Sequence, residues 1–217
     1  MKKILISLSL VLFTIAGFAQ KLKPVVVDSL VTVSLPQKYV RKDTLGQTTY
    51  SGNSQYGYMV VIRAPNAVGN QPLDKERDLN KVLKDYIDGI KGQASGSAQY
   101  VRDTTIGRLK AKTFTLSINE GAGVKLRNFI IIYTKEVTYT FEYFYEEARQ
   151  DVIKDEYKAF SSSIKLAPEL TRTDQYLSNE KGISPNAKLG IYGGGALIVI
   201  IIIVVLVRRK KKHQEHH

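Results

Sequence analysis

All three histidines of this 217-residue chain, His213, His216 and His217, lie at its C-terminal end. Histidine is the side chain best suited to exchange a proton near neutral pH, and it is a common metal ligand. The rest of the chain therefore has no imidazole for a Ser-His catalytic pair or for a histidine metal site. Exposed histidines at a frayed chain end more often have no specific role, so we predict no metal and no cofactor.

Ser162 and Lys165 reproduce the Ser-x-x-Lys spacing of serine enzymes that act on cell-wall peptides. Those enzymes also carry Ser-Asp-Asn and Lys-Thr-Gly motifs, and neither tripeptide occurs in this sequence. Polar residues are also expected at the end of a helix, where this motif falls. The spacing by itself does not indicate catalysis.

Glu142, Glu146 and Glu147 are carboxylates close to an aromatic strand that could stack on a sugar. Glycoside hydrolysis needs two carboxyl groups that face each other across a cleft, which neighbours at one strand end cannot provide. Negative charge at 146 and 147 is also typical of the first turn of a helix. A carboxylate site would need Glu120, Glu142 or Asp103 to converge from distant strands. We predict no catalytic residue and keep a hydrolase as an alternative.

Two apolar segments bracket the chain and predict its topology. The first, from Ile4 to Ala16, follows two lysines and is typical of a signal peptide, residues 1–19, cleaved after Ala19. The second, residues 189–207, is long enough to form a transmembrane helix. A cytoplasmic tail, residues 208–217, then begins with a basic cluster at the membrane surface: Arg208, Arg209, Lys210, Lys211 and Lys212. We expect a single-pass protein of the cell membrane with its N-terminal domain outside the cytoplasm.

The exported region has a modest positive charge, because residues 21–188 contain 25 Lys and Arg against 19 Asp and Glu. Such an excess is typical of solvated lysines, and it also favours approach to acidic headgroups, glycans or proteins. Nucleic acid is not expected as a partner, because the compartment separates it from this domain and no RNA-recognition motif is present. The chain has no cysteine, which excludes disulfides and thiol catalysis. Together with the short signal segment, this composition favours a bacterial origin.

The apolar spacing predicts one α+β domain over residues 20–166, an antiparallel sheet packed with two main helices. We expect strands over residues 25–35, 47–52, 57–63, 100–105, 109–118, 126–133 and 137–145, and helices over residues 73–91 and 146–163. The inner side of the first helix would carry Leu79, Val82, Leu83, Tyr86, Ile87 and Ile90, and that of the second Val152, Ile153, Tyr157 and Phe160. Alternation in residues 109–118 places Phe114, Leu116 and Ile118 on one face and Thr113, Thr115 and Ser117 on the other.

The densest aromatic run is Tyr139, Phe141, Tyr143, Phe144 and Tyr145. Four of the five share one parity and therefore one face of the predicted strand. Such a face is typical of an antiparallel strand that packs on the core. If a helix covers only half of that face, the tyrosines also offer a surface on which a ligand can stack.

Several short segments stand in an order seen in a known family. They are Val33-Ser34-Leu35-Pro36 before a glycine-bearing hairpin, Thr105-Ile106-Gly107 before Lys110-Ala111-Lys112-Thr113-Phe114, Tyr139-Thr140-Phe141, and Phe160-Ser161-Ser162-Ser163-Ile164. Over about residues 28–166 this order resembles the photosystem II subunit P-like (PsbP-like) fold, including its bacterial exported and membrane-anchored relatives. The resemblance implies a binding or assembly subunit without a shared catalytic set, and no functional residue of the family maps onto this chain.

Residues 167–188 are polar and show no apolar periodicity, so we predict a flexible stalk that spans on the order of 25 Å. In the membrane segment, Gly190 and Gly194 stand four residues apart. This spacing lets two helices approach closely and favours helix self-association in a homodimer.

The tail after the membrane segment is too short for a folded output domain. Our first hypothesis is a membrane-tethered binding module that acts on another envelope protein, with tethering raising its concentration near that partner. Contacts would be sought in the loops around Asn53, residues 66–71 and residues 119–123. The alternatives are an envelope hydrolase with a carboxylate site and a ligand sensor that is coupled to a separate membrane protein.

Overall fold

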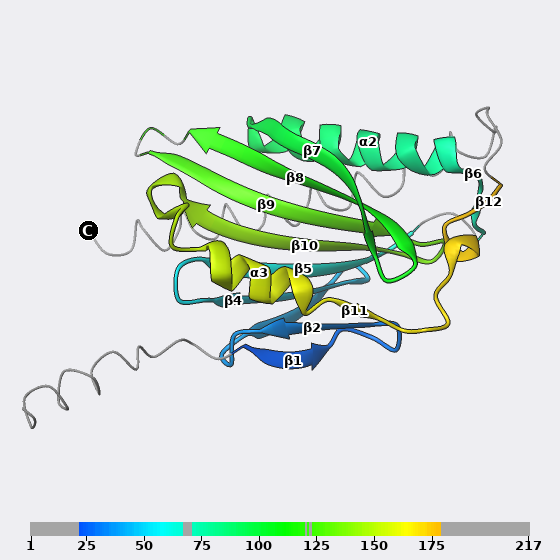
Figure 1. Ribbon diagram of the computed structural model, residues 1–217, viewed down its shortest axis with the longest axis horizontal. Coiled ribbons are helices and arrows are strands. Elements are labelled where there is room, and N and C mark those ends of the chain that lie inside the picture. Colours follow the sequence, from blue (N-terminus) through cyan, green and yellow to red (C-terminus); the bar gives the residue numbers. More distant parts are fainter. Residues whose placement is uncertain (1–21, 67–70, 120, 122, 179–217) are drawn as a thin grey trace, which may run out of the picture.

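The computed structural model describes residues 22–66, 71–119, 121 and 123–178, and Figure 1 shows their arrangement. The strands of the large sheet are β3 (Val40–Thr44), β4 (Gln47–Asn53), β5 (Tyr58–Pro65), β7 (Ser97–Ile106), β8 (Leu109–Asn119), β9 (Val124–Tyr133) and β10 (Val137–Glu146). The remaining strands are β1 (Lys23–Val26), β2 (Val31–Leu35), β6 (Leu73–Lys75), β11 (Lys165–Leu166) and β12 (Tyr176–Ser178). The helices are α2 (Glu76–Ala94) and α3 (Lys154–Ser162), with short 3-10 turns η1 (Glu147–Arg149) and η2 (Arg172–Asp174).

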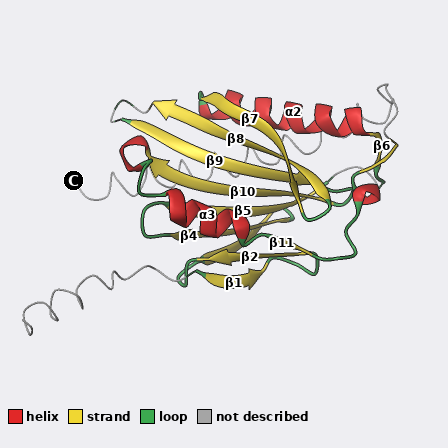
Figure 2. Ribbon diagram, in the orientation of Figure 1, coloured by secondary structure: helices red, strands yellow, loops and turns green. Residues whose placement is uncertain are grey.

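The strands of the large sheet pair antiparallel in the order β3-β4-β5-β10-β9-β8-β7. The sheet is the middle of three layers, with α2 on one face and α3 together with the small β1-β2-β11 sheet on the other (Figures 1 and 2). Each face of the large sheet therefore closes a core of its own, which confirms the predicted α+β class with an antiparallel sheet and two main helices.

Alternation in β10 separates the two cores. Tyr139, Phe141, Tyr143 and Tyr145 point to the core beneath β1, β2 and α3, and all four are buried. Phe144 points to the opposite face, where Tyr58 packs edge-on against it at 6.0 Å between ring centroids. The predicted core-facing position of the aromatic residues is therefore confirmed. Because both faces of β10 are covered, the residues on its other face up to Phe144 are buried or half-buried as well.

The amphipathic helix α2 covers the other face of the sheet. Its six predicted inner residues, Leu79, Val82, Leu83, Tyr86, Ile87 and Ile90, are all buried against β8 and β9. The helix begins and ends three residues later than its predicted bounds, because Leu73–Lys75 forms β6 and Ser95 at φ 48° supplies the left-handed C-cap. Gly92 does not break it.

The predicted first strand over residues 25–35 is in fact a hairpin of β1 and β2. Asp28 makes the turn between them, since its Oδ1 accepts hydrogen bonds from the backbone N–H groups of Leu30 and Val31 at 2.9 and 3.0 Å. An aspartate that bonds to the backbone two residues on is a turn former, and this signal was hidden among β-branched neighbours. The strand does stop before Pro36 as expected.

The predicted second helix is shorter than residues 146–163. The chain makes the turn η1 first and begins α3 only at Lys154. Ile153 and Phe160 are buried and Tyr157 packs partly buried beside them, but Val152 is 54% exposed, so its predicted inward position is wrong. Strand β3 was not predicted, because all its residues are exposed and its sequence has no apolar alternation.

The chain after β11 folds onto the domain instead of leaving it. Leu170 and Tyr176 are 5% and 2% exposed, and β12 pairs in parallel with β6. Gln175 is fully buried, and its side chain accepts a hydrogen bond from the Lys110 N–H and donates to the Lys110 and Tyr133 carbonyl oxygens, each at 2.8 Å. The domain boundary at residue 166 and the stalk prediction for residues 167–178 are therefore wrong.

The remaining segments of the predicted topology lie outside the described residues. These are the signal peptide, residues 179–188 of the stalk, the transmembrane helix with Gly190 and Gly194, and the basic tail. Within the described part of the chain, no helix combines the length and apolarity needed to cross a membrane.

Candidate functional site

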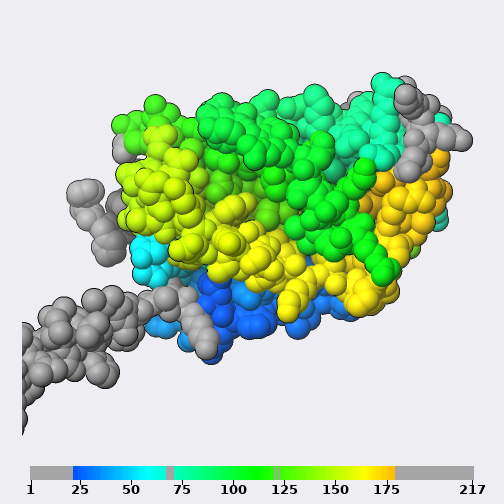
Figure 3. All heavy atoms as spheres, in the orientation of Figure 1, coloured from blue at the N-terminus to red at the C-terminus, as the bar shows by residue number. Residues whose placement is uncertain are grey.

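A cavity of about 450 Å³ opens on the face of the sheet that carries α3. Its floor is the end of β8, β9 and β10, with Thr115, Asn128 and Tyr145 among the lining residues. Its walls are β7 on one side and η1 with the start of α3 on the other, which are seen in green and yellow in Figure 3. A volume of this size is in the range of small-molecule binding sites.

The cavity exists because α3 covers only part of this sheet face. Tyr157 and Phe160 of α3 pack on Tyr143, with ring centroids 5.8 and 6.4 Å apart, and so close the core over β10. The neighbouring face of β8 carries Thr113, Thr115 and Ser117, which are only half-buried. The predicted polar face of this strand is therefore the uncovered floor of the site.

Asn128 has a fixed orientation at the centre of the floor. Thr115 lies opposite it on β8, and its hydroxyl donates to Asn128 Oδ1 at 2.8 Å. The Tyr145 hydroxyl donates to the same oxygen at 3.5 Å. Because both hydroxyls occupy the amide oxygen, the Asn128 NH₂ group remains the donor that a ligand can use.

Two tyrosines give the cavity apolar surface with polar tips. Burial raises the pKa of Tyr157 to about 12, and burial likewise raises the pKa of Tyr145. Both phenols are therefore protonated at physiological pH and act as neutral hydrogen-bonding groups. Neither is suited to serve as a general base.

Charged side chains occur at the rim of the cavity. Lys154 is held by Asp151 at 2.8 Å, and Glu147 is exposed at the start of η1. Arg102 of β7 is exposed and makes no ion pair with any described residue. The cations stand on opposite walls, so the rim does not concentrate positive charge at one point.

Strand β7 bends at the cavity through a β-bulge. The pairing with β8 shifts between Gln99 and Arg102, and Tyr100 lies there at φ 55°. A tyrosine in the left-handed region is an outlier that costs on the order of 1–2 kcal/mol. Bulges of this kind occur beside binding sites, where they redirect a side chain, and Tyr100 lines this cavity.

The carboxylates considered from the sequence do not converge. Glu147 lies at the cavity rim, whereas Glu142 is buried on the opposite sheet face and Glu146 is exposed beside Arg149. Asp103 is on β7 with Lys112, and β8 and β9 separate β7 from β10, which places the two strands about 14 Å apart. Glu120 lies outside the described residues. The described carboxylates thus form no facing pair in this cavity.

Both residues of the Ser-x-x-Lys motif are exposed. Ser162 is exposed in the last turn of α3, where its hydroxyl donates to the Ala159 carbonyl oxygen at 3.4 Å. Lys165 is exposed in β11.

Asn66 lies in one of the loops predicted for contacts. Its NH₂ group donates to the Thr134 carbonyl oxygen at 2.6 Å, and its Oδ1 accepts from the Thr138 hydroxyl at 2.8 Å.

Glu142 is a buried titratable group outside the cavity. Burial raises the pKa of its carboxyl to about 7, an effect that the Arg127 guanidinium opposes. The ordinary value for this carboxyl is 4.5. Between these two values the folded protein holds the proton more tightly than the unfolded chain does, so this group makes the fold less stable as pH rises through that window.

We therefore expect Glu142→Gln to raise the free energy of unfolding by about 2–3 kcal/mol at pH 8 and by less than about 1 kcal/mol at pH 5. Urea unfolding of both proteins at the two pH values measures this difference. Exposed Glu146→Gln is the control and should change stability little at either pH. An equal effect of Glu142→Gln at pH 5 and pH 8 would contradict the assignment.

Sequence reasoning missed most residues of the site. Tyr100 lies in a bulge, Asn128 in an interior strand and Gln150 directly after η1, and none belongs to a recognisable motif. The available signal was the run of small hydroxyl residues at 113, 115 and 117 on an interior strand. Such a polar face is compatible with an interior strand only where the opposite layer leaves it open.

Comparison with known proteins gives one kind of match. No family model matches the chain, and no curated protein matches its sequence significantly. Among solved structures, the chain is similar to the solution structure of the cyanobacterial PsbP (CyanoP) of Synechocystis sp. PCC 6803. The TM-score is 0.45 and the identity 15%, over 70% of this chain and 95% of that chain. The matched structure is that of a PsbP, and the sequence pattern resembles the PsbP-like family.

Proposed function

We propose that this protein is a membrane-tethered extracytoplasmic binding module and that the cavity between β7 and α3 is its binding site. The observation that supports this proposal is the combination of Asn128, held with its NH₂ group free, and the two neutral tyrosines Tyr145 and Tyr157. Groups of this kind orient a ligand by hydrogen bonds and apolar contact. They do not activate a nucleophile or supply a facing pair of carboxylates.

The folded C-terminal segment limits how far such a module would stand from a membrane. Ser178 ends β12, and residues 179–188 are all that join it to the predicted transmembrane helix. A chain of this length reaches at most about 35 Å when fully extended. The module would therefore act close to the membrane surface, on a partner or ligand that is itself in the envelope.

Site-specific photocrosslinking tests whether the cavity is occupied in the cell. A benzophenone amino acid replaces Gln150 at the cavity, or Lys84 on the exposed side of α2 as the control. We expect an adduct at position 150 and a weaker one, or none, at position 84 after irradiation of native membranes. The expected adduct disappears when Tyr157→Ala removes one wall of the cavity.

Mass spectrometry of the crosslinked protein gives the mass of the bound molecule, whatever its chemical class. The proposal fails if position 150 gives no adduct above position 84. It also fails if Tyr157→Ala leaves the adduct unchanged while the variant remains folded by circular dichroism.

A further inference from the structure

We infer that the cavity binds a short oligosaccharide and that Tyr100 closes over the bound sugar ring; this inference rests on the proposed function of the cavity. A sugar ring has an apolar C–H face and a rim of hydroxyl groups. It therefore needs an aromatic surface and neutral donors and acceptors in the same site. The floor and the two walls of the cavity supply both the aromatic surface and the neutral hydrogen-bonding groups.

The floor matches the hydroxyl rim of a sugar. The Asn128 NH₂ group can donate to ring hydroxyls, because Thr115 and Tyr145 already occupy its oxygen. Ser117 and Thr113 add hydroxyls on the same strand face, which can both donate and accept. The cavity volume of about 450 Å³ exceeds that of a single hexose and leaves room for a second ring.

Other ligand classes fit the site less well. An acyl chain would remove the Asn128 NH₂ group from water without giving it a partner, which costs free energy. A phosphate group would favour several cations at one point, whereas Lys154 is paired with Asp151 and Arg102 stands on the opposite wall.

A peptide added as a strand to the edge of β7 would need a regular row of backbone groups. The bulge between Gln99 and Arg102 and the left-handed Tyr100 interrupt that row beside the cavity. Such irregularities protect edge strands against strand addition. The geometry of β7 therefore favours a ligand held by side chains.

Tyr100 has a backbone conformation that is unusual for a tyrosine. It is 66% exposed, it occupies the left-handed region, and it borders the cavity. A bulky residue in this region is strained, and such strain is retained where the position of the side chain matters. Because its ring is mostly in solvent, it has apolar surface left to bury when a sugar ring stacks on it.

Tyrosine fluorescence reports binding directly, because the chain has no tryptophan and Tyr100, Tyr145 and Tyr157 line the cavity. The probes are cellobiose, N,N′-diacetylchitobiose and digalacturonic acid, titrated into the full chain in detergent. Backbone amide NMR shifts of residues 99–102, 113–117 and 126–128 locate the site. We expect at least one disaccharide to bind with millimolar or tighter affinity and to shift these amides.

Tyr100→Asn separates the binding role from a structural one. Asparagine tolerates the left-handed region, so this variant should unfold at a higher temperature while its affinity for the disaccharide falls about tenfold. Val101→Asn is the matched control, since Val101 is also exposed in β7 but does not line the cavity. It should leave the affinity unchanged.

The inference is overturned if none of the three disaccharides shifts the cavity amides, or if Tyr100→Asn binds as well as the parent protein. The two proposals then separate clearly. A crosslinked adduct at position 150 without any disaccharide binding keeps the binding module and rejects the sugar. Absence of both results rejects both.

Discussion

Replacing Gln175 by alanine is expected to lower the free energy of unfolding by about 3–5 kcal/mol. The buried side chain of Gln175 supplies hydrogen-bond partners to the backbone at the start of β8 and the end of β9, through three hydrogen bonds of 2.8 Å to Lys110 and Tyr133. Without it, one N–H and two carbonyl groups lose their partners at once. Each buried group left unpaired costs about 1–3 kcal/mol, less whatever water can recover.

The same substitution is expected to release the last folded segment. Gln175 also accepts the Leu73 N–H at its backbone oxygen, next to the β12–β6 pair and the buried ring of Tyr176. Urea unfolding measures the stability, and limited proteolysis after Arg172 detects the release. Exposed Gln71→Ala is the matched control and should behave as the parent protein. A fragment that ends at residue 166 should be less stable than one that ends at 178, and equal stabilities would contradict this account.

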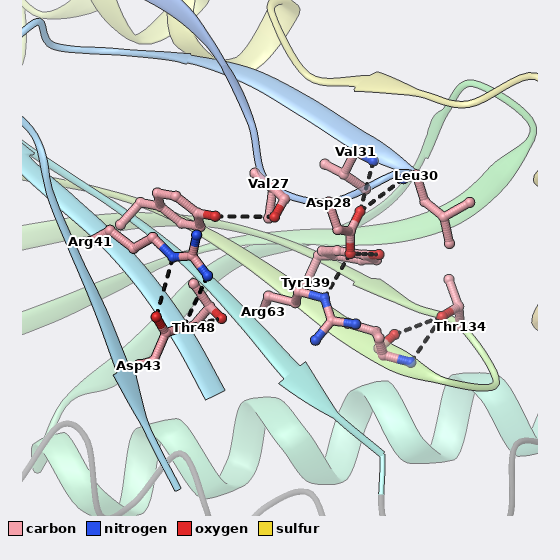
Figure 4. A network of polar contacts seen from close by, with 12 residues as sticks. Val27, Asp28, Leu30, Val31, Arg41, Asp43, Thr48, Arg63, Thr134 and Tyr139 are labelled. Atoms are coloured by element: carbon pink, nitrogen blue, oxygen red, sulfur yellow. Dashed lines mark hydrogen bonds and ion pairs between the residues drawn. The ribbon is translucent and has the colours of Figure 1, made fainter. Parts of the chain in front are cut away.

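Asp28→Ala is expected to lower the free energy of unfolding by about 3–4 kcal/mol. Asp28 is the centre of the network in Figure 4: Oδ1 accepts the Leu30 and Val31 N–H groups, and Oδ2 accepts Arg63 Nε and the Tyr139 hydroxyl, both at 2.7 Å. Its loss leaves a buried phenol and a partly buried guanidinium without their acceptor. It also leaves the Leu30 and Val31 N–H groups of the β1–β2 turn without their acceptor.

The exposed pair Arg41–Asp43 provides the control for this prediction, because it is also an aspartate-arginine contact in Figure 4. Asp43→Ala should change stability much less, since water screens the exposed ion pair and only the Thr48 hydroxyl, which donates to Asp43 at 2.6 Å, loses its acceptor. A double-mutant cycle of Asp28→Ala with Tyr139→Phe isolates the hydroxyl contact, and we expect a coupling of about 1–2 kcal/mol. Equal losses for Asp28→Ala and Asp43→Ala, measured by urea unfolding, would show that the network is not the cause.

Local pattern was sufficient for the elements that bury one clear face. The inner residues of α2 and the alternating face of β10 follow from spacing alone, because period and burial agree there. Local pattern failed where a polar side chain takes the place of a backbone hydrogen-bond partner. The turn at Asp28 divides one apolar segment into the two strands of a hairpin. Gln175 binds the polar segment after residue 166, which was predicted to be a stalk, to the domain. Neither effect has a periodic signal.

Residues close together in the chain were sufficient to predict the α+β class, the two main helices and the polar face of β8. The part of that face that stays uncovered depends on how α3 and β7 pack on the sheet. Three separate parts of the chain form the site: β7, which bends at Tyr100; β9, which carries Asn128 with its free NH₂ group; and α3, which covers the sheet face only in part. Packing between the layers brings these parts together. It depends on the shapes of side chains that are far apart in the sequence, and no local pattern contains that information.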